Sequence, residues 1–258
     1  MRSTSLQNLQ RQIEKVVVDN LPKDPLRWCK GLRGREKIVH DSLWGTFKLK
    51  PHEVAVIDAP LVQRLRFIRQ TGAVYLTYPS ALHTRFEHTL GVLHQASEMC
   101  RILRERRGPS QFGEETEDNV RMSAILHDTG HGPFSHTSEQ YFSSLEIFSK
   151  LKSTEAEFAE SGAGEILSSL IISSDSFRKF IRTVNTVFDK KIDLDVIRKM
   201  ITGTLKPDQL YLSEIIHGPL DADKLDYMHR DGMFSGLKMH VDLDRLYASI
   251  AIPSGTRR

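Results

Sequence analysis

The sequence predicts an all-α protein with one small β-hairpin near its N-terminus. Apolar residues recur at spacings of three and four along most of the 258 residues, which is the pattern of amphipathic helices. Alternating β–α–β units are absent, so a doubly wound parallel sheet is disfavoured. Only residues 37–49 contain two short strand-like runs that flank a turn.

The first fifty residues supply a helix, a linker and the hairpin. Apolar residues from Leu6 to Val17 predict an amphipathic helix over residues 3–18, and the Pro-rich segment 20–25 ends it. The runs 37–40 and 46–49 form the expected hairpin. We therefore expect two parts, which are an N-terminal helix with its linker over residues 1–36 and a helical domain over residues 37–258.

The pattern is helical almost throughout from Pro51 onward. Pro60 suits the first turn of a helix that ends at Gly72, and Thr84 caps a long helix that reaches Arg107. Residues 108–118 are polar and acidic and predict a surface loop. Further helical patterns cover residues 120–127, 135–148, 164–173, 176–188, 193–202 and 208–230, and resume from Asp242.

Composition excludes several classes of protein. With 36 Lys and Arg against 33 Asp and Glu, the charge is too balanced for a dedicated nucleic-acid coat. Apolar runs are too short to span a membrane, so no membrane partner is expected. Two cysteines exclude a disulfide scaffold and suit a reducing cytoplasm, or a nucleus in a eukaryote. Six of the eleven histidines fall between His83 and His136, and this concentration indicates chemistry.

The adjacent pair His127-Asp128 is a candidate metal site. Imidazole nitrogen and carboxylate oxygen both bind divalent cations, and His88 and Asp223 would complete a shell of two histidines and two aspartates. Such a shell leaves coordination positions open for water and substrate, as a catalytic metal requires. A lone His-Asp pair is more often a helix-end hydrogen bond. Here, however, the segment from Gly130 to His136 adds two further histidines to the same turn.

One face of the helix that contains Asp223 gathers polar groups. At about 100° per residue, Lys224, Tyr227 and Asp231 fall within one quadrant of Asp223. An ammonium, a phenol and a second carboxylate beside a metal would suit a phosphate and a sugar. Asp226 and Arg230 suit an i,i+4 ion pair on a solvated face, and we expect them to be structural.

Four separated strings in the same order resemble the HD-domain phosphohydrolases, and among them the deoxynucleoside triphosphate triphosphohydrolase branch. The strings are Gln63-Arg64-Leu65-Arg66, the segment from His83 to His88, the segment from His127 to His136, and Asp223-Lys224-Leu225-Asp226-Tyr227. The resemblance covers about residues 38–236 and implies an HD-domain helical bundle. It also implies a homo-oligomer and a large helical lobe after this region, so we interpret the chain either as a short family member or as a fragment. In the second case we expect exposed apolar surface near residues 241–252.

The resemblance also implies roles for individual residues. Metal ligands are implied at His88, His127, Asp128 and Asp223. Triphosphate contacts are implied at Arg85, Lys224 and Tyr227, and contacts to the sugar 3′-hydroxyl at Gln70 and Asp231. His131 and His136 match active-site histidines that act with Asp128, and His136 is the expected proton carrier. Asp58 and Arg66 match residues of an allosteric nucleotide site, although helix packing explains Arg66 equally well.

The expected function is metal-dependent hydrolysis of a dNTP to a deoxynucleoside and triphosphate. The ligand set accepts Mn, Fe, Zn, Co or Ni, and Mg would accompany the substrate phosphates. One alternative is hydrolysis of another nucleotide, either a nucleoside monophosphate or a cyclic nucleotide. A second alternative is a non-catalytic module that binds nucleotides or, weakly, single-stranded nucleic acid through the arginines at 101, 104, 106 and 107. Such a basic cluster is more often a solvated helix end.

Overall fold

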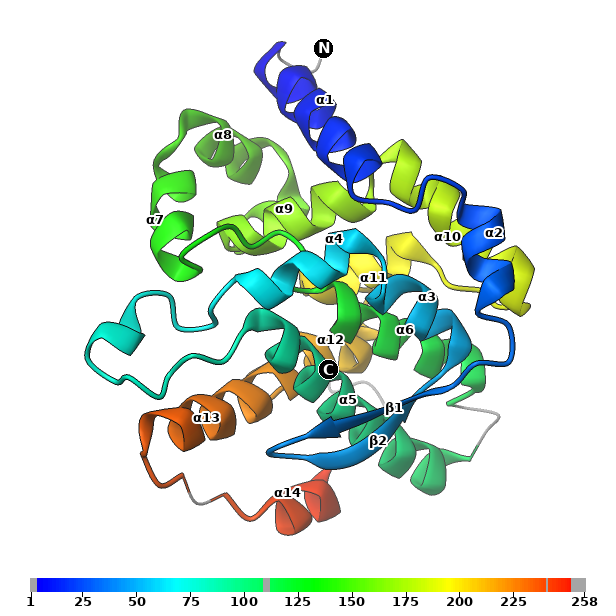
Figure 1. Ribbon diagram of the computed structural model, residues 1–258, viewed down its shortest axis with the longest axis vertical. Helices are drawn as coiled ribbons and strands as arrows, with labels where there is room; N and C mark the ends of the chain where they lie inside the picture. The colour runs from blue at the N-terminus through cyan, green and yellow to red at the C-terminus, as the bar shows by residue number, and fades with distance from the viewer. Residues whose placement is uncertain (1–3, 109–111, 240, 252–258) are drawn as a thin grey trace.

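A computed structural model describes residues 4–108, 112–239 and 241–251 of the chain. Helices surround the 23-residue helix α5 (Arg85–Arg107), and one antiparallel hairpin lies beside it (Figure 1). The expectation of an all-α protein with a small N-terminal hairpin is confirmed. In the described part of the chain, no helix combines the length and apolar character that crossing a membrane requires.

Three helices form the framework of the molecule. Helix α5 packs against α6 (Glu114–Leu126) and α13 (Ala222–Ser235). Thr84 begins α5 with a capping box, as its side chain caps the first turn and Glu87 accepts from the Thr84 backbone N–H. Because α5 is buried on several sides, His88 in its first turns lies inside the molecule rather than on a surface.

The hairpin packs against α5. Strand β1 (Lys37–Asp41) pairs with β2 (Gly45–Leu49), with Lys37 opposite Leu49 and Asp41 opposite Gly45. Gly45 has a φ of +75°, a left-handed conformation that glycine adopts without strain. Leu49 is fully buried and anchors the hairpin in the main core.

The N-terminal segment contains more helix than the sequence predicted. Helix α1 (Thr4–Asp19) agrees with the expectation, but the expected linker contains α2 (Pro25–Gly31). Asp24 caps α2 by accepting from the Arg27 backbone N–H, with Pro25 at the first helical position. Both are standard start signals, so the sequence did carry the information. Helix α3 (Pro51–Ile57) follows the hairpin.

The expected helix from Pro60 to Gly72 is wrong beyond its first turn. Helix α4 (Pro60–Gln63) continues as a 3-10 turn, η1 (Arg64–Phe67), and the chain is then extended at Ile68. The backbone carbonyl of Ile68 accepts from Arg85 N–H at 2.8 Å. This hydrogen bond to the start of α5 takes the place of a helical one. It is a tertiary contact, which the spacing of apolar residues in the sequence does not predict. A second 3-10 turn, η2 (Val74–Leu76), follows.

Three further boundaries differ from the expectations. The loop expected over residues 108–118 is shorter, because α6 begins at Glu114, where acidic residues favour a helix N-terminus. The pattern over 135–148 divides into α7 (His136–Ser144) and α8 (Glu146–Thr154). The pattern over 208–230 divides at Gly218-Pro219 into α12 (Leu210–Ile216) and α13.

A second, smaller hydrophobic core joins the N-terminal helix to helices from the middle of the chain. It contains Leu6 of α1, Phe148 of α8 and Ile166 of α9 (Ala163–Ile172). The 3-10 turn η3 (Ala156–Phe158) lies where the sequence predicted no helix. The remaining helices, α10 (Asp175–Phe188), α11 (Leu194–Ile201) and α14 (Leu243–Ser249), agree with the sequence patterns.

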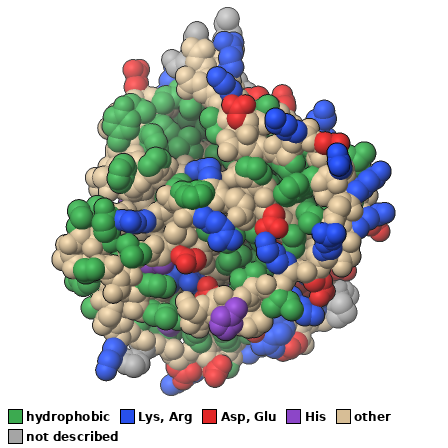
Figure 2. Space-filling view, in the orientation of Figure 1, with side chains coloured by type: hydrophobic (Ala, Val, Ile, Leu, Met, Phe, Trp, Pro, Cys, Tyr) green, Lys and Arg blue, Asp and Glu red, His purple; other side chains and the backbone are tan. Residues whose placement is uncertain are grey.

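Exposed apolar side chains lie both beside the expected place and elsewhere. Leu237 and Met239, just before residue 241, are exposed. Leu243, Leu246 and Ile250 are half-buried against the main core, and Val241 is the exposed large apolar residue of residues 241–251. Ile252 lies outside the described residues. Figure 2 shows hydrophobic side chains gathered also along the margin formed by α7 and the segment before α5. The exposed residues there include Phe67, Leu76, Leu82, Phe134 and Tyr141.

Candidate metal centre and active site

Four side chains converge on one point, where α5, the end of α6 and the start of α13 meet. Nitrogen and oxygen atoms of His88, His127 and Asp128 lie within 4.8 Å of one another, and all three residues are buried. Asp223 joins them from α13, with its Oδ1 2.9 Å from His88 Nε2 and 3.9 Å from His127 Nε2. The four residues expected as metal ligands are therefore brought together.

Hydrogen bonds at Nδ1 orient the rings of His88 and His127 so that each Nε2 faces the centre. His88 Nδ1 donates to Asp226 Oδ2 at 2.8 Å, and His127 Nδ1 donates to the Ala124 carbonyl at 2.8 Å. Each ring therefore presents its Nε2 lone pair to the centre, which is how metal-bound histidines are usually oriented. Among the described residues, buried His127 Nε2 has no hydrogen-bond partner, and buried His88 Nε2 faces the Asp223 carboxylate at 2.9 Å. Because buried polar atoms are rarely left unpaired and imidazole and carboxylate groups both bind divalent cations, this arrangement fits a divalent metal ion.

The electrostatic field of the centre also favours positive charge. Burial lowers the pKa of the His88 imidazole, but hydrogen bonds with Asp223 and Asp226 outweigh it and raise the pKa to about 10. Burial would raise the pKa of Asp128, yet the charges of Arg85, His127 and His131 hold it well below its usual range. The carboxylates are thus ionised, and a bound cation would replace the proton at His88.

Asp226 and Arg230 do not lie on a solvated face, and that expectation is wrong. Both are almost fully buried, although they do form the expected i,i+4 pair, with Arg230 Nε donating to Asp226 Oδ2 at 2.8 Å. Trp44 Nε1 donates to Asp226 as well. Helix α13 places Asp226 toward α5 because α13 is packed there along its length. Asp226 therefore orients His88, one of the expected metal ligands, and the sequence pattern alone missed this contact.

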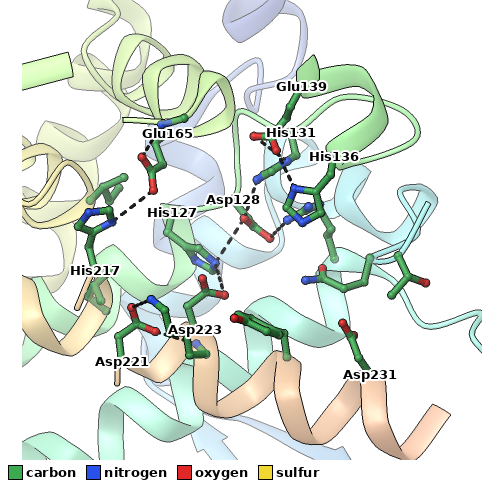
Figure 3. Close-up of a pocket in the computed structure, with 18 residues that line it drawn as sticks. His127, Asp128, His131, His136, Glu139, Glu165, His217, Asp221, Asp223 and Asp231 are labelled. Carbon is green, nitrogen blue, oxygen red and sulfur yellow. Dashed lines mark hydrogen bonds and ion pairs between the residues drawn. The ribbon is translucent and has the colours of Figure 1, made fainter. Parts of the chain in front are cut away.

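A cavity of about 500 Å³ opens over this centre. Figure 3 shows residues of the centre, among them His127, Asp128 and Asp223, between His217 on one side and Asp231 on the other. The lining contains the expected site residues Gln70, Arg85, His127, Asp128, His131, His136, Asp223, Lys224, Tyr227 and Asp231. His88 lies beneath the lining and is fully buried.

Arg85 is the buried cation of the cavity. Its Nη1 donates to Asp128 Oδ2 at 2.6 Å and its Nε donates to Ser135 Oγ at 2.9 Å. Ser135 in turn donates to the Gln70 carbonyl at 2.8 Å and has a φ of +52°. A strained, fully bonded serine thus fixes the guanidinium next to the metal ligand, where negative charge on a phosphoryl group would develop.

The two active-site histidines share one carboxylate. His136 Nδ1 donates to Glu139 Oε2 at 2.7 Å, and His131 Nδ1 lies 3.6 Å from Glu139 Oε1. His131 is buried and its Nε2 lies 3.1 Å from Asp128 Oδ1, whereas His136 is largely exposed. This exposure leaves His136 Nε2 free to exchange protons with a substrate or solvent. Glu139 was not predicted, although its i+3 spacing from His136 was a readable signal.

The polar helix face predicted after Asp223 is present. Lys224, Tyr227 and Asp231 all line the cavity. Lys224 Nζ donates to Asp221 Oδ2 at 2.7 Å and to the Gly218 carbonyl at 2.6 Å, so its position is set by the turn before α13. Burial lowers the pKa of Lys224, but Asp221 raises it overall, so the ammonium form is favoured.

The opposite end of the cavity offers hydrogen-bonding groups without partners. Gln70 Oε1 and Thr71 Oγ1 are buried and unpaired, and both residues line the cavity. Asp231 Oδ1 accepts from His83 Nε2 at 2.7 Å, and its side chain stays one-third exposed. Such acceptors and donors suit the hydroxyl groups of a sugar.

The two expected allosteric residues lie outside this cavity lining. Asp58 pairs with Lys37 at 2.6 Å, and the Arg66 guanidinium stacks 3.6 Å from the centre of the Phe86 ring. Both therefore have partners within the chain.

The arginine cluster at the end of α5 is also mostly engaged within the chain. Arg101 pairs with Glu98 and Glu105. Arg104 pairs with Glu117, and Arg106 donates to the Ala248 carbonyl at 2.6 Å. Figure 2 instead shows Lys and Arg side chains along the margin formed by α2 and α10.

Comparisons with a family model, with curated proteins and with solved structures show which proteins this chain resembles. The HD domain family model matches residues 85–231. An uncharacterized protein from Methanocaldococcus jannaschii is 34% identical over 83% of this chain and 38% of its own length. Deoxynucleoside triphosphate triphosphohydrolase SAMHD1 from Homo sapiens is 29% identical over 81% of this chain and 35% of its length. The chain thus spans little more than a third of these curated relatives.

A solved structure agrees with these matches. A hypothetical protein from Aquifex aeolicus superposes with a TM-score of 0.63 at 28% identity. The match covers 83% of this chain and 51% of that protein.

Proposed function

This chain belongs to the HD-domain phosphohydrolase family, and from that premise we propose that it hydrolyses dNTPs to deoxynucleosides and inorganic triphosphate. One observation carries the proposal. The candidate centre at His88, His127, Asp128 and Asp223 lies at a cavity whose lining contains the ammonium of Lys224 and the buried, unpaired Oε1 of Gln70. A polyphosphate joined to a sugar requires these two kinds of contact.

The reaction requires one bond to form and one to break. The oxygen of water adds to the α-phosphorus, and the bond from this phosphorus to the 5′-oxygen breaks. The 5′-oxygen keeps the electron pair and gains a proton, while the water loses one. A divalent metal ion at the centre would supply a Lewis acid that polarises the phosphoryl oxygen.

Residues of the chain would perform the remaining tasks. Arg85 and Lys224 would neutralise charge that builds on the phosphates, which is the main requirement of phosphoryl transfer. His136 would deliver the proton to the departing 5′-oxygen, with Glu139 holding its other nitrogen. Gln70 and Asp231 would hold the sugar so that the α-phosphate meets the centre.

Product identification tests the proposal. The chain is loaded with Mn²⁺, incubated with Mg²⁺ and each of the four dNTPs, and the products are identified by mass. We expect triphosphate and deoxynucleoside, and no turnover in the Asp128→Asn protein. Pyrophosphate with a monophosphate, turnover only of a nucleoside monophosphate or a cyclic nucleotide, or no turnover at all would each contradict the proposal.

A further inference from the structure

One histidine of the cavity has no role in the reaction described above. His217 follows α12 and lines the cavity, and its side chain is 41% exposed. Its Nδ1 lies 3.3 Å from Glu165 Oε1, on the side of the centre opposite Asp231 (Figure 3). In the part of the chain that the structure describes, no hydrogen bond engages its Nε2.

Glu165 is held in place by the start of α9. Its Oε2 accepts from the Gly162 backbone N–H at 2.8 Å, at the N-cap of α9. Gly203 makes room for the histidine ring, since a Cβ at that position would lie 2.8 Å from His217 Cδ2. Three separate segments therefore define one position for this imidazole, and a prearranged donor binds a ligand at lower entropic cost.

The turn that joins α12 to α13 fixes His217 relative to Lys224. Asp221 is almost fully buried, and it accepts from the backbone N–H groups of Gly218 and Lys224 at 2.8 and 2.7 Å. Lys224 Nζ closes the turn on the Gly218 carbonyl. The residue next to His217 is thus bonded directly to the lysine that would bind phosphate.

The arrangement gives the cavity a direction. Figure 3 shows Asp231 on one side of the centre, and His217 and Asp221, which accepts from Lys224 Nζ, on the other side. We propose that His217, positioned by Glu165, binds the terminal phosphate of the substrate and so selects triphosphates over monophosphates. This inference rests on the proposed nucleotide hydrolysis and names a determinant of its substrate class.

The charge state of His217 supports this assignment. The hydrogen bond to Glu165 raises the pKa of the imidazole, and Asp221 adds to the effect. Burial and the neighbouring Lys224 oppose it without reversing it. The raised pKa extends the imidazolium form to higher pH. That form has one N–H for Glu165 and one for an anion, and a hydrogen bond from a charged donor is the stronger kind.

Binding measurements with inorganic ligands test the inference without relying on turnover. Calorimetry on the Mn²⁺-loaded chain compares inorganic triphosphate with orthophosphate, which occupies the centre alone. We expect His217→Gln to weaken triphosphate binding about tenfold or more, the loss typical of one charge-assisted hydrogen bond, and to change orthophosphate binding less than about twofold. Glu165→Gln should show the same pattern with a smaller loss. Arg178→Gln removes a cation of a surface ion pair outside this cavity lining and serves as the matched control.

Each outcome has a defined meaning. Unchanged triphosphate binding in a folded His217→Gln protein would show that the His217–Glu165 pair only joins two helices, and would overturn the inference. Equal losses for both ligands would place His217 at the centre and would overturn it as well. If wild-type protein binds triphosphate in this His217-dependent way but cleaves no dNTP, the proposed function fails and the binding assignment stands.

Discussion

Asp223 and Asp226, three residues apart on α13, hold the two nitrogens of one imidazole. Asp223 Oδ1 lies 2.9 Å from His88 Nε2, and Asp226 Oδ2 accepts from His88 Nδ1 at 2.8 Å. Residues three apart share a helix face, so one helix supplies both an expected metal ligand, Asp223, and the group that orients a second one, His88. This relationship makes α13 the element on which the geometry of the centre depends.

The first prediction concerns Asp226. Asp226→Asn preserves the shape of the side chain but removes the charge behind His88. We expect the affinity for Mn²⁺ to fall about 10- to 100-fold, as is typical when the partner of a metal-bound histidine is changed. Metal titration followed by calorimetry measures this loss. Asp195→Asn, on the exposed Arg178–Asp195 pair, is the control, and an affinity equal to wild type would contradict the role of Asp226.

The second prediction concerns Gly91, which lies on α5 opposite Asp226. A Cβ at residue 91 would lie 1.8 Å from Asp226 Oδ1 and 2.5 Å from Arg230 Nη2. We expect Gly91→Ala to lower the free energy of unfolding by about 3 kcal/mol or more. The Asp226 and Arg230 side chains are buried and ion-paired, so they cannot move away from an added methyl group without loss of packing. Urea unfolding measures the change. Gly31→Ala, where nothing lies within 4 Å, should change stability by less than about 1 kcal/mol. Similar values for both variants would refute close packing at Gly91.

The third prediction concerns Asp128. Asp128→Asn should leave the chain almost free of transition metal and without turnover, because the carboxylate is lost from the centre. Elemental analysis of the folded fraction checks the stoichiometry, which we expect to approach one per chain in wild type. Stability should fall as well, since Arg85 loses its buried partner. Wild-type metal content together with full activity in this variant would remove Asp128 from the site.

The fourth prediction concerns Lys224. Lys224→Ala should leave metal content close to wild type, because its Nζ bonds Asp221 and Gly218 rather than a ligand of the centre. Affinity for inorganic triphosphate should fall about tenfold or more. Lys191→Ala, at an exposed lysine outside the cavity lining, is the matched control. Loss of metal with unchanged triphosphate affinity would be the opposite of what this geometry predicts.

The fifth prediction concerns acid stability. Burial opposes ionisation of Asp118, but hydrogen bonds from Lys50 and Lys190 lower its pKa below the usual value. A carboxyl whose pKa is lower in the folded state contributes stability above its unfolded pKa, and this contribution is lost as pH falls through the folded pKa. We expect urea unfolding to show a smaller loss between pH 7 and pH 3 in Asp118→Asn than in wild type. The exposed Asp208→Asn should keep the wild-type slope, and identical slopes in all three proteins would contradict the prediction.

Local patterns were sufficient for the fold class and for the choice of four residues that the structure brings together. Helical periodicity and the single hairpin signal depend on neighbouring residues, and these were read correctly from the chain. The ligand residues were identifiable because imidazole and carboxylate side chains are concentrated at His127-Asp128 and Asp223, beyond what helix formation needs. Which metal and which base the site takes does not follow from these residue types, since several cations accept the same donors.

Tertiary contacts decided the rest. The helix after Pro60 ends early because Ile68 bonds the start of α5, and a periodic pattern contains no record of a partner 17 residues away. Asp226 and Arg230 have the spacing of a surface pair, yet packing of α13 on α5 buries them and makes Asp226 the support of His88. His217 and Glu165 are 52 residues apart and meet only when α9 and α12 line one cavity. Sequence determines which chemical groups are available, whereas burial and long-range pairing determine which of them act together.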